Sequence, residues 1–243
     1  MFIKIVVVLL LLIVIVSLLN GRTASRIPPP SAPAKPVLRT LILRIAIVLV
    51  AIGAVLAALH LSGCSKPDEP FHATDITGAD FGRQSVLANL TDHNGHRPAS
   101  ADFLGKAVVI FFGYTQCPDI CPTTMSALKE AMNLLGPEAD RVQVLFVTVD
   151  PERDTPAVLA AYVPWFDARF LGLYGDAKTT LEIAKEFRVF YAKVKGETAL
   201  GYSIDHSATS YAYDPQGRPR LLIRHGETPQ HIAADLRKLL AGK

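Results

Sequence analysis

Cysteine is scarce in this chain, with three residues in 243. A small domain braced by disulfides needs more of them, so that class of protein is excluded. Acidic residues are missing from the first 64 positions, where six Lys and Arg residues stand alone. The rest of the chain holds 19 Lys and Arg against 22 Asp and Glu, which gives no support for nucleic-acid binding.

Two long apolar runs, residues 5–19 and 45–61, are separated by a basic, Pro-rich connector at residues 20–44. Such a connector is expected to stay on the cytoplasmic side of a membrane, which places the later residues outside the cytoplasm, in the periplasm of a Gram-negative cell. The second run ends in Leu-Ser-Gly-Cys64, which resembles a bacterial lipoprotein signal whose cysteine is lipidated. A plain transmembrane anchor is the alternative.

The first apolar run has two explanations. It is either a second membrane span or the result of a start assigned too far upstream, with the true start near residue 37. We therefore expect three parts: membrane segments with a lipoprotein signal at 1–64, a tether at 65–80, and one folded domain at 81–243. That length suits a single globular domain.

An apolar run at residues 108–112 predicts a buried strand in the folded part. It breaks at Gly113, and a short loop with Cys117 and Cys121 leads into a helix expected to begin at Pro122. Further strands are predicted at residues 142–149, 171–174, 207–213 and 218–224, an extended stretch at 189–194, and helices up to 166, at 177–187 and at 229–240.

This order of elements predicts an α/β, thioredoxin-like fold with elements inserted after the cysteine helix. An N-terminal β-hairpin is also expected, because a strand-like segment at residues 85–91 runs into an Asn-Gly pair that ends at Gly95.

Cys117 and Cys121 are expected at the positive end of a helix, a setting that favours thiolate over thiol. Three residues separate them, one more than in the common redox motif. The wider loop lets both sulfurs converge on one metal ion, and it also permits disulfide closure. The spacing alone therefore leaves both soft-metal binding and redox exchange open.

His206 is the candidate third ligand. It precedes the penultimate strand, at the place where thioredoxin-like proteins usually carry a cis-proline opposite the cysteines. No proline lies between Pro164 and Pro215. An imidazole supplies an electron pair, so this replacement favours metal binding over dithiol exchange. The other six histidines are expected in structural or solvated positions, His93 and His96 among the solvated ones.

Two thiolates with one neutral imidazole suit Cu(I), and Cu(II) is also feasible. Zinc would need a fourth ligand for a closed site. Asp150, Asp154 and Asp205 are candidates for it. For the first two, capping of a Pro-containing turn and pairing with Arg153 is the favoured interpretation.

The chain resembles the Sco/SenC proteins, copper-binding, thioredoxin-like assembly factors of cytochrome c oxidase. The resemblance covers residues 81–240 and rests on three separated motifs. These are the Phe-Gly-Tyr-Thr-Gln-Cys-Pro-Asp-Ile-Cys-Pro segment ending at Pro122, the Val-Asp-Pro-Glu-Arg-Asp-Thr segment ending at Thr155, and the Tyr-Ser-Ile-Asp-His-Ser segment ending at Ser207. The double apolar segment departs from the family's usual single anchor.

The resemblance implies a metallochaperone with copper as its ion and Cys117, Cys121 and His206 as the ligands. It implies a membrane-tethered domain outside the cytoplasm, and delivery to the dinuclear copper centre of cytochrome c oxidase subunit II. The expected partners are that subunit, the membrane and other copper chaperones, with no nucleic acid.

Three alternatives use the same thiols. In a thiol–disulfide oxidoreductase, Cys117 would attack a client disulfide and Cys121 would resolve the mixed disulfide. A peroxidase is disfavoured, because Thr115 lies two rather than three positions before the first cysteine and the loop lacks an arginine. A purely structural disulfide would leave His206 without a role.

Overall fold

The computed structural model describes residues 45–53, 70–195 and 201–243. Contacts divide the chain into two units, Met1–Pro67 and Asp68–Lys243. In the first unit, residues 45–53 form a helix, which takes up part of the second apolar run. Among the described residues, none of the helices combines the length and apolarity that crossing a membrane requires. The first apolar run and the lipidation predicted at Cys64 lie outside the described residues.

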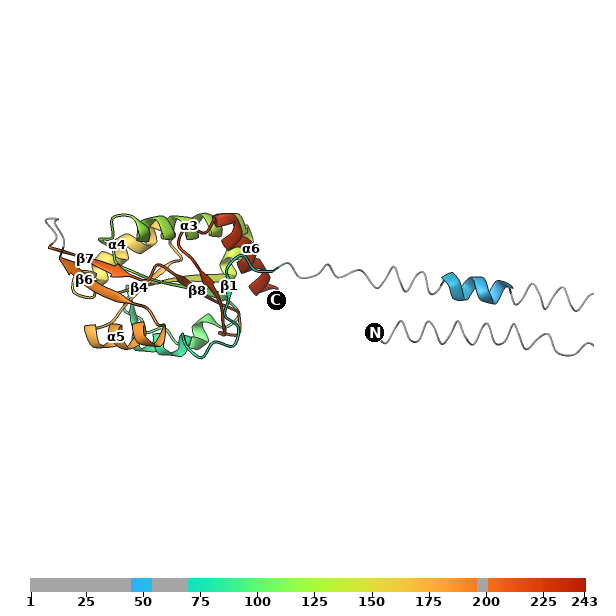
Figure 1. Ribbon diagram of the computed structural model, residues 1–243, viewed down its shortest axis with the longest axis horizontal. Helices are drawn as coiled ribbons and strands as arrows, with labels where there is room; N and C mark the ends of the chain where they lie inside the picture. Colours follow the sequence, from blue (N-terminus) through green and yellow to red (C-terminus); the bar gives the residue numbers. More distant parts are fainter. Residues whose placement is uncertain (1–44, 54–69, 196–200) are drawn as a thin grey trace, which may run out of the picture. The chain divides into compact units, whose positions relative to one another are not determined.

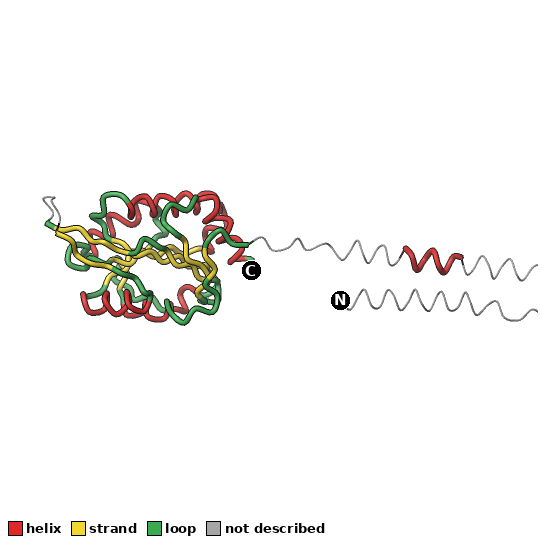
Figure 2. Tube along the Cα trace, viewed as in Figure 1, coloured by secondary structure: helices red, strands yellow, loops and turns green. Residues whose placement is uncertain are grey.

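A seven-stranded sheet forms the centre of the second unit, in the order β1-β9-β8-β3-β4-β5-β2 (Figures 1 and 2). Its middle strands β3 and β4 are parallel, and every residue of both is buried. Continuous apolar runs are what strands with both faces covered require. The strands are β1 Thr74–Asp75, β2 Thr91–Asp92, β3 Ala107–Gly113, β4 Val142–Thr148, β5 Leu171–Tyr174, β8 Ser210–Tyr213 and β9 Pro219–Ile223.

Helices cover both faces of this sheet. Figure 1 shows α3, α4 and α6 on one side and α5 on the other. Three of them begin with an N-cap residue, a Thr or Asp whose side chain accepts a hydrogen bond from the backbone N–H three residues later. These residues are Thr155, Asp176 and Thr228. The helices are α3 Ile120–Leu135, α4 Pro156–Phe166, α5 Ala177–Glu186 and α6 Pro229–Leu240.

The α/β, thioredoxin-like order is confirmed, but the predicted N-terminal β-hairpin is wrong. Gln84–Asn89 forms a 3₁₀ helix, and β2 pairs with β5 instead of a neighbouring strand. A tight turn does form, since Gly95 has a φ of +88° and the Asp92 carboxylate accepts two backbone N–H groups within it. The chain then passes through Pro98 into a second 3₁₀ turn, so it does not run back along β2.

Part of the stretch expected as a tether belongs to the folded unit. β1 pairs antiparallel with β9 at the sheet's edge. Just before it, the buried carboxylate of Asp235 on α6 accepts the backbone N–H groups of His72 at 3.0 Å and Ala73 at 2.8 Å. Two hydrogen bonds to a charged carboxylate therefore anchor the start of the domain to its last helix.

A second, two-stranded sheet consists of β6 Tyr191–Lys195 and β7 Tyr202–His206. The sequence predicts an extended stretch for the first of these strands and no strand for the second. The two strands are antiparallel, and Tyr191, the first residue of β6, pairs with His206, the last residue of β7. In Figure 1 this hairpin projects at the end of the domain away from α6.

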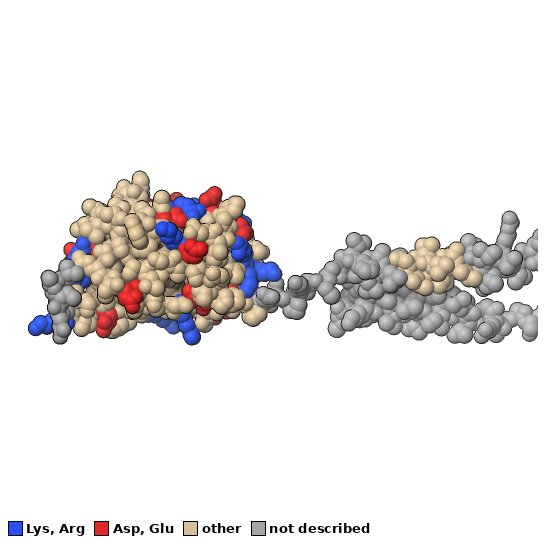
Figure 3. All heavy atoms as spheres, turned by 90° about the horizontal axis from the view of Figure 1, so that it is seen from above, with Lys and Arg blue, Asp and Glu red and all other residues tan. Residues whose placement is uncertain are grey.

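Charged side chains are interspersed on the face that Figure 3 presents, with Lys and Arg lying close to Asp and Glu. Several form ion pairs, such as Arg237 with Glu138 at 3.0 Å. Exposed pairs of this kind add little stability, so the fold depends on its buried sheet and helices.

Candidate metal centre

The two thiols lie where β3 turns into α3. Cys117 is half-buried in the loop, and Cys121 is fully buried in the first turn of the helix. The helix begins at Ile120, two residues before the predicted start at Pro122. Backbone N–H groups in the first turn of a helix have no partner within the helix. The N–H of Cys121 is one of them, and it donates to the Cys117 sulfur 3.4 Å away.

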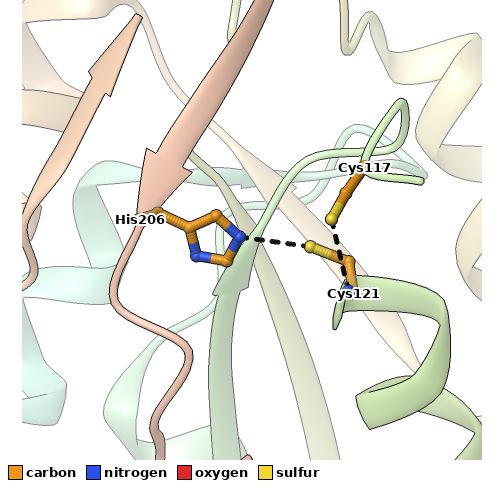
Figure 4. Close-up of side chains that lie close together, drawn as sticks. All are labelled: Cys117, Cys121 and His206. Carbon is orange, nitrogen blue, oxygen red and sulfur yellow. Dashed lines mark hydrogen bonds between the residues drawn. The ribbon is translucent and has the colours of Figure 1, made fainter. Parts of the chain in front are cut away.

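His206 reaches the same place from the end of β7. Its Nε2 lies 3.3 Å from the Cys121 sulfur, as Figure 4 shows. The ligand atoms of Cys117, Cys121 and His206 all lie within 4.8 Å of one another. In the described part of the chain, this is the one group of three or more His, Cys, Asp and Glu side chains that could hold a metal ion.

The backbone fixes the tautomer of His206. Its Nδ1 lies 3.0 Å from the carbonyl oxygen of Ser207. A carbonyl only accepts, so Nδ1 carries the proton and donates it. Nε2 therefore presents its lone pair to the thiols. Metal-binding histidines are oriented in this way by a partner on the other ring nitrogen.

The donor atoms fit a metal ion with little movement. Bonds of about 2.3 Å to sulfur and about 2.0 Å to an imidazole nitrogen would separate those two atoms by about 3.5 Å at a tetrahedral angle. The observed separation for Cys121 and His206 is 3.3 Å. Thiolate and imidazole together select a soft or borderline ion, copper or zinc, rather than Mg²⁺ or Ca²⁺.

The two thiols differ in acidity. A hydrogen bond from the Cys121 thiol lowers the pKa of Cys117 to about 3, and hydrogen bonds from backbone N–H groups add to the effect against the opposing effect of burial. The same hydrogen bond, together with burial, raises the pKa of Cys121 well above its ordinary value. The metal-free site therefore holds one thiolate and one proton, which a metal ion must displace from Cys121.

In the metal-free protein, iodoacetamide should alkylate Cys117 at a nearly constant rate from about pH 5 to about pH 8, because a thiol with a pKa of about 3 is ionised throughout. An ordinary thiol becomes about tenfold more reactive per pH unit below its pKa of about 8.5. Cys121→Ala removes the largest cause of the low pKa, so the rate in that variant should rise with pH. Alkylation time courses followed by mass spectrometry test this, and a tenfold rise per pH unit in the parent protein would contradict the assignment.

The acidic candidates for a fourth ligand have other partners. Asp150 is fully buried and pairs with Arg153. Asp154 accepts the hydroxyl of Thr115 at 2.6 Å and that of Thr148 at 2.6 Å, although burial raises its pKa. Asp205 is exposed. The expected pairing with Arg153 is confirmed for Asp150, whereas the Asp154 side chain bonds Thr115 and Thr148.

Two histidines expected in ordinary positions make specific contacts. His93 was expected in solvent, but its Nδ1 accepts the backbone N–H of Gly172 at 2.9 Å, and burial lowers its pKa. His72 stacks on His231 with ring centroids 3.8 Å apart. His96 is exposed, as expected. Among the described histidines, only His206 joins the thiols.

Aromatic rings surround the imidazole. Tyr114 meets the His206 ring edge-on at 5.8 Å, and Phe111 does so at 6.2 Å. Tyr114 is buried, and its hydroxyl accepts the backbone N–H of Ile204 at 3.3 Å. This contact has no signal in the sequence. The tyrosine stands in the first motif, but no periodicity connects it with a strand ninety residues further on.

Comparison with known proteins supports one assignment. The protein-family model described as SCO1/SenC matches residues 76–241, more than half of the chain. The chain belongs to the SCO1/SenC family. It is 33% identical over 215 residues to the mitochondrial protein SCO2 homolog of Bos taurus, an alignment that covers 86% of this chain and 78% of that one.

Solved SCO1/SenC structures share its fold. Bradyrhizobium japonicum ScoI, determined with copper bound, is 39% identical, with a TM-score of 0.57 over 62% of this chain and 95% of that one. Yeast Sco1, also determined with copper bound, is 28% identical, with a TM-score of 0.58 over 72% of this chain and 91% of that one.

Proposed function

We propose that this SCO1/SenC protein carries copper, binding it through Cys117, Cys121 and His206. The observation that carries the proposal is the convergence of two sulfurs and one imidazole nitrogen within 4.8 Å, from a loop, a helix and a separate hairpin. Relatives determined with copper bound support the choice of copper over zinc. Among the described residues, no fourth His, Cys, Asp or Glu joins this group, which also disfavours a closed zinc site.

The site suits transfer of its ion. Cys121 is buried, whereas Cys117 and His206 are half-buried, so an incoming ligand can approach from their side. With both cysteines ionised, the site carries a charge of −1 when Cu(I) is bound and 0 when Cu(II) is bound. The oxidation state therefore changes the local electrostatics by a full unit in a partly desolvated place.

The proposed client is the dinuclear copper centre of cytochrome c oxidase subunit II, which follows from the family resemblance. The proposed location is outside the cytoplasm, tethered to the membrane. The basic connector and the apolar runs of the first 64 residues support it. Lipidation of Cys64 would supply a further anchor.

A second function is supported by the acidity of the thiols. A half-buried thiolate beside a buried, protonated thiol is the arrangement of an attacking and a resolving cysteine. The protein would then reduce a disulfide in its client, becoming oxidised to a Cys117–Cys121 disulfide while the client gains two thiols. A dicysteine copper centre must be reduced before it can be metallated, so the two functions are compatible.

His206→Ala in the full-length protein, purified in detergent, tests the copper proposal. Loss of one of three ligands should lower copper affinity by more than about 100-fold, since loss of a mere outer partner of a ligand costs 10- to 100-fold. Affinity is measured by competition with a chelator of known strength, and folding by circular dichroism. Unchanged affinity in a folded variant would overturn the three-ligand site.

The dithiol's reduction potential separates the two functions. A potential well above that of the client disulfide leaves copper carriage alone, because the dithiol would then not reduce the client by exchange. A potential at or below that of the client, with copper affinity in the micromolar range or weaker, would favour the reductase.

A further inference from the structure

The strand that carries His206 belongs to the two-stranded sheet β6–β7, which shares no strand pairing with the seven-stranded sheet. Both thiols, in contrast, follow directly from β3, the middle strand of the large sheet. Strand hydrogen bonds therefore do not fix the distance between the imidazole and the sulfurs. The short link from β7 to β8 and side-chain contacts with the rest of the domain must do so.

Tyr202, the first residue of β7, makes the main polar contacts between the hairpin and the rest of the domain. Its hydroxyl donates to Asp150 Oδ1 at 2.8 Å, and its carbonyl oxygen accepts from Arg153 Nη1 at 2.9 Å. The guanidinium of Arg153 lies 3.7 Å from the centre of the Tyr202 ring. Asp150 and Arg153 also pair with each other, and both side chains are largely buried, 0% and 15% exposed.

The turn after β4 that supplies these two residues also holds the cysteine loop. Asp154 accepts the backbone N–H of Thr115 at 3.1 Å and its hydroxyl at 2.6 Å, two residues before Cys117. One turn, residues 149–155, thus holds the thiol loop with one side chain and the histidine strand with two others. These contacts join the second sequence motif, residues 149–155, to the third, residues 202–207. The second motif supplies no metal ligand, and the third supplies His206.

We propose that Asp150, Arg153 and Tyr202 form a latch that positions His206 against the two thiols and thereby sets how firmly the site holds copper. The inference rests on the proposed function. Planar stacking, a two-pronged guanidinium and a buried carboxylate give the latch a defined geometry. When the latch is open, His206 moves away with β7, and the ion is left on two sulfurs, open to ligands from a client. The three are positioning residues, since none of them touches the ion.

The test is a double-mutant cycle between Arg153→Lys and His206→Ala in the full-length protein. Lysine keeps the positive charge that pairs with Asp150. It loses the planar, forked guanidinium that bonds the Tyr202 carbonyl and lies over the Tyr202 ring. Arg153→Lys alone should lower copper affinity about 10- to 100-fold, the usual cost of losing a partner that orients a ligand. In the His206→Ala background it should have no further effect, because the residue it positions is gone.

Glu152→Gln is the matched control. Glu152 joins the same turn to the same hairpin through Lys193 at 2.6 Å, but both side chains are about half exposed or more (62% and 47%). Exposed pairs contribute little, so copper affinity should stay within about twofold of the parent. If Arg153→Lys does not fold, Tyr202→Phe replaces it in the cycle, since it keeps the ring and removes only the hydroxyl bound to Asp150.

Amide hydrogen exchange of the metal-free variants gives a readout independent of copper. Amides of β6 and β7 should exchange several-fold faster in the latch variant and at the parent rate in Glu152→Gln. Equal losses of copper affinity with and without His206, or unchanged exchange in the hairpin, would overturn the latch. Failure of the parent protein to bind copper would overturn the proposed function instead, while the exchange data would still decide whether the latch holds the hairpin.

Discussion

Cys121→Ala is expected to abolish copper binding at micromolar concentrations, the largest effect of any single substitution in the domain. Cys121 is the buried member of the pair, and its sulfur lies 3.3 Å from the His206 nitrogen, at the centre of the three-atom cluster. Alanine leaves one half-buried sulfur and an imidazole, which cannot exclude water from the ion. Affinity should fall by well over the 100-fold that loss of an outer partner can cost. Chelator competition measures the loss.

Met125→Leu is the control for this substitution. Met125 is fully buried one turn further along α3, so the two positions share a helix and a core. Exchange of Met for Leu conserves volume and costs less than about 1.5 kcal/mol. Copper affinity should remain that of the parent. A Cys121→Ala protein that is folded and still binds copper as tightly as Met125→Leu would show that Cys121 is not a ligand.

Gly113→Ala should both destabilise the domain and disturb the site. A methyl group at Gly113 would lie 2.9 Å from the Cys121 sulfur and 2.9 Å from Cε2 of Phe146, closer than real side chains approach. Both neighbours are fully buried, so the backbone or the thiol must move. Such overpacking costs about 1–3 kcal/mol, which urea denaturation resolves. Copper affinity should fall as well, because the displaced atom is a ligand.

Gly175→Ala separates these two effects. Its added methyl group would lie 2.9 Å from Leu90 Cδ2 and 3.0 Å from Thr179 Cγ2, an equally close approach that does not involve the thiols. This variant should lose stability and keep the parent's copper affinity. If both glycine variants weaken copper binding equally, the loss reflects general destabilisation rather than displacement of Cys121.

The centre of the fold could be predicted because its signals are local. The strands β3 and β4 begin and end within one residue of their predicted bounds. The cysteine helix has one apolar face, and its buried residues include Met125, Leu128 and Met132. Burial on both faces demands continuous apolar sequence, and a helix that packs on a sheet demands a period of 3.6.

The edges could not be predicted in the same way. An Asn-Gly pair fixes a turn but not the strands beside it, so β2 pairs with β5 across the domain. β7 was missed because its residues alternate weakly, with Ile204 the one fully buried position. Pairing with β6 and the contacts of Tyr202, rather than local propensity, make this segment a strand.

For the candidate site, the sequence supplied the ligand types but not their support. Cys117, Cys121 and His206 stand out because cysteine is rare and because a histidine stands where a proline was expected. Asp150 and Arg153 were recognised as an ion pair. Their contact with Tyr202 joins residues about fifty positions apart, and nothing in the spacing of the two motifs indicates that they meet.

X-ray absorption at the copper edge reports the atoms bound to the ion itself. In the copper-loaded parent we expect two sulfur neighbours at about 2.2–2.3 Å and one imidazole nitrogen at about 2.0 Å. In His206→Ala the nitrogen signal should disappear while sulfur neighbours remain around any bound copper. A nitrogen signal that persists unchanged in His206→Ala, or a parent spectrum with no sulfur neighbours, would contradict a copper site built from these three residues.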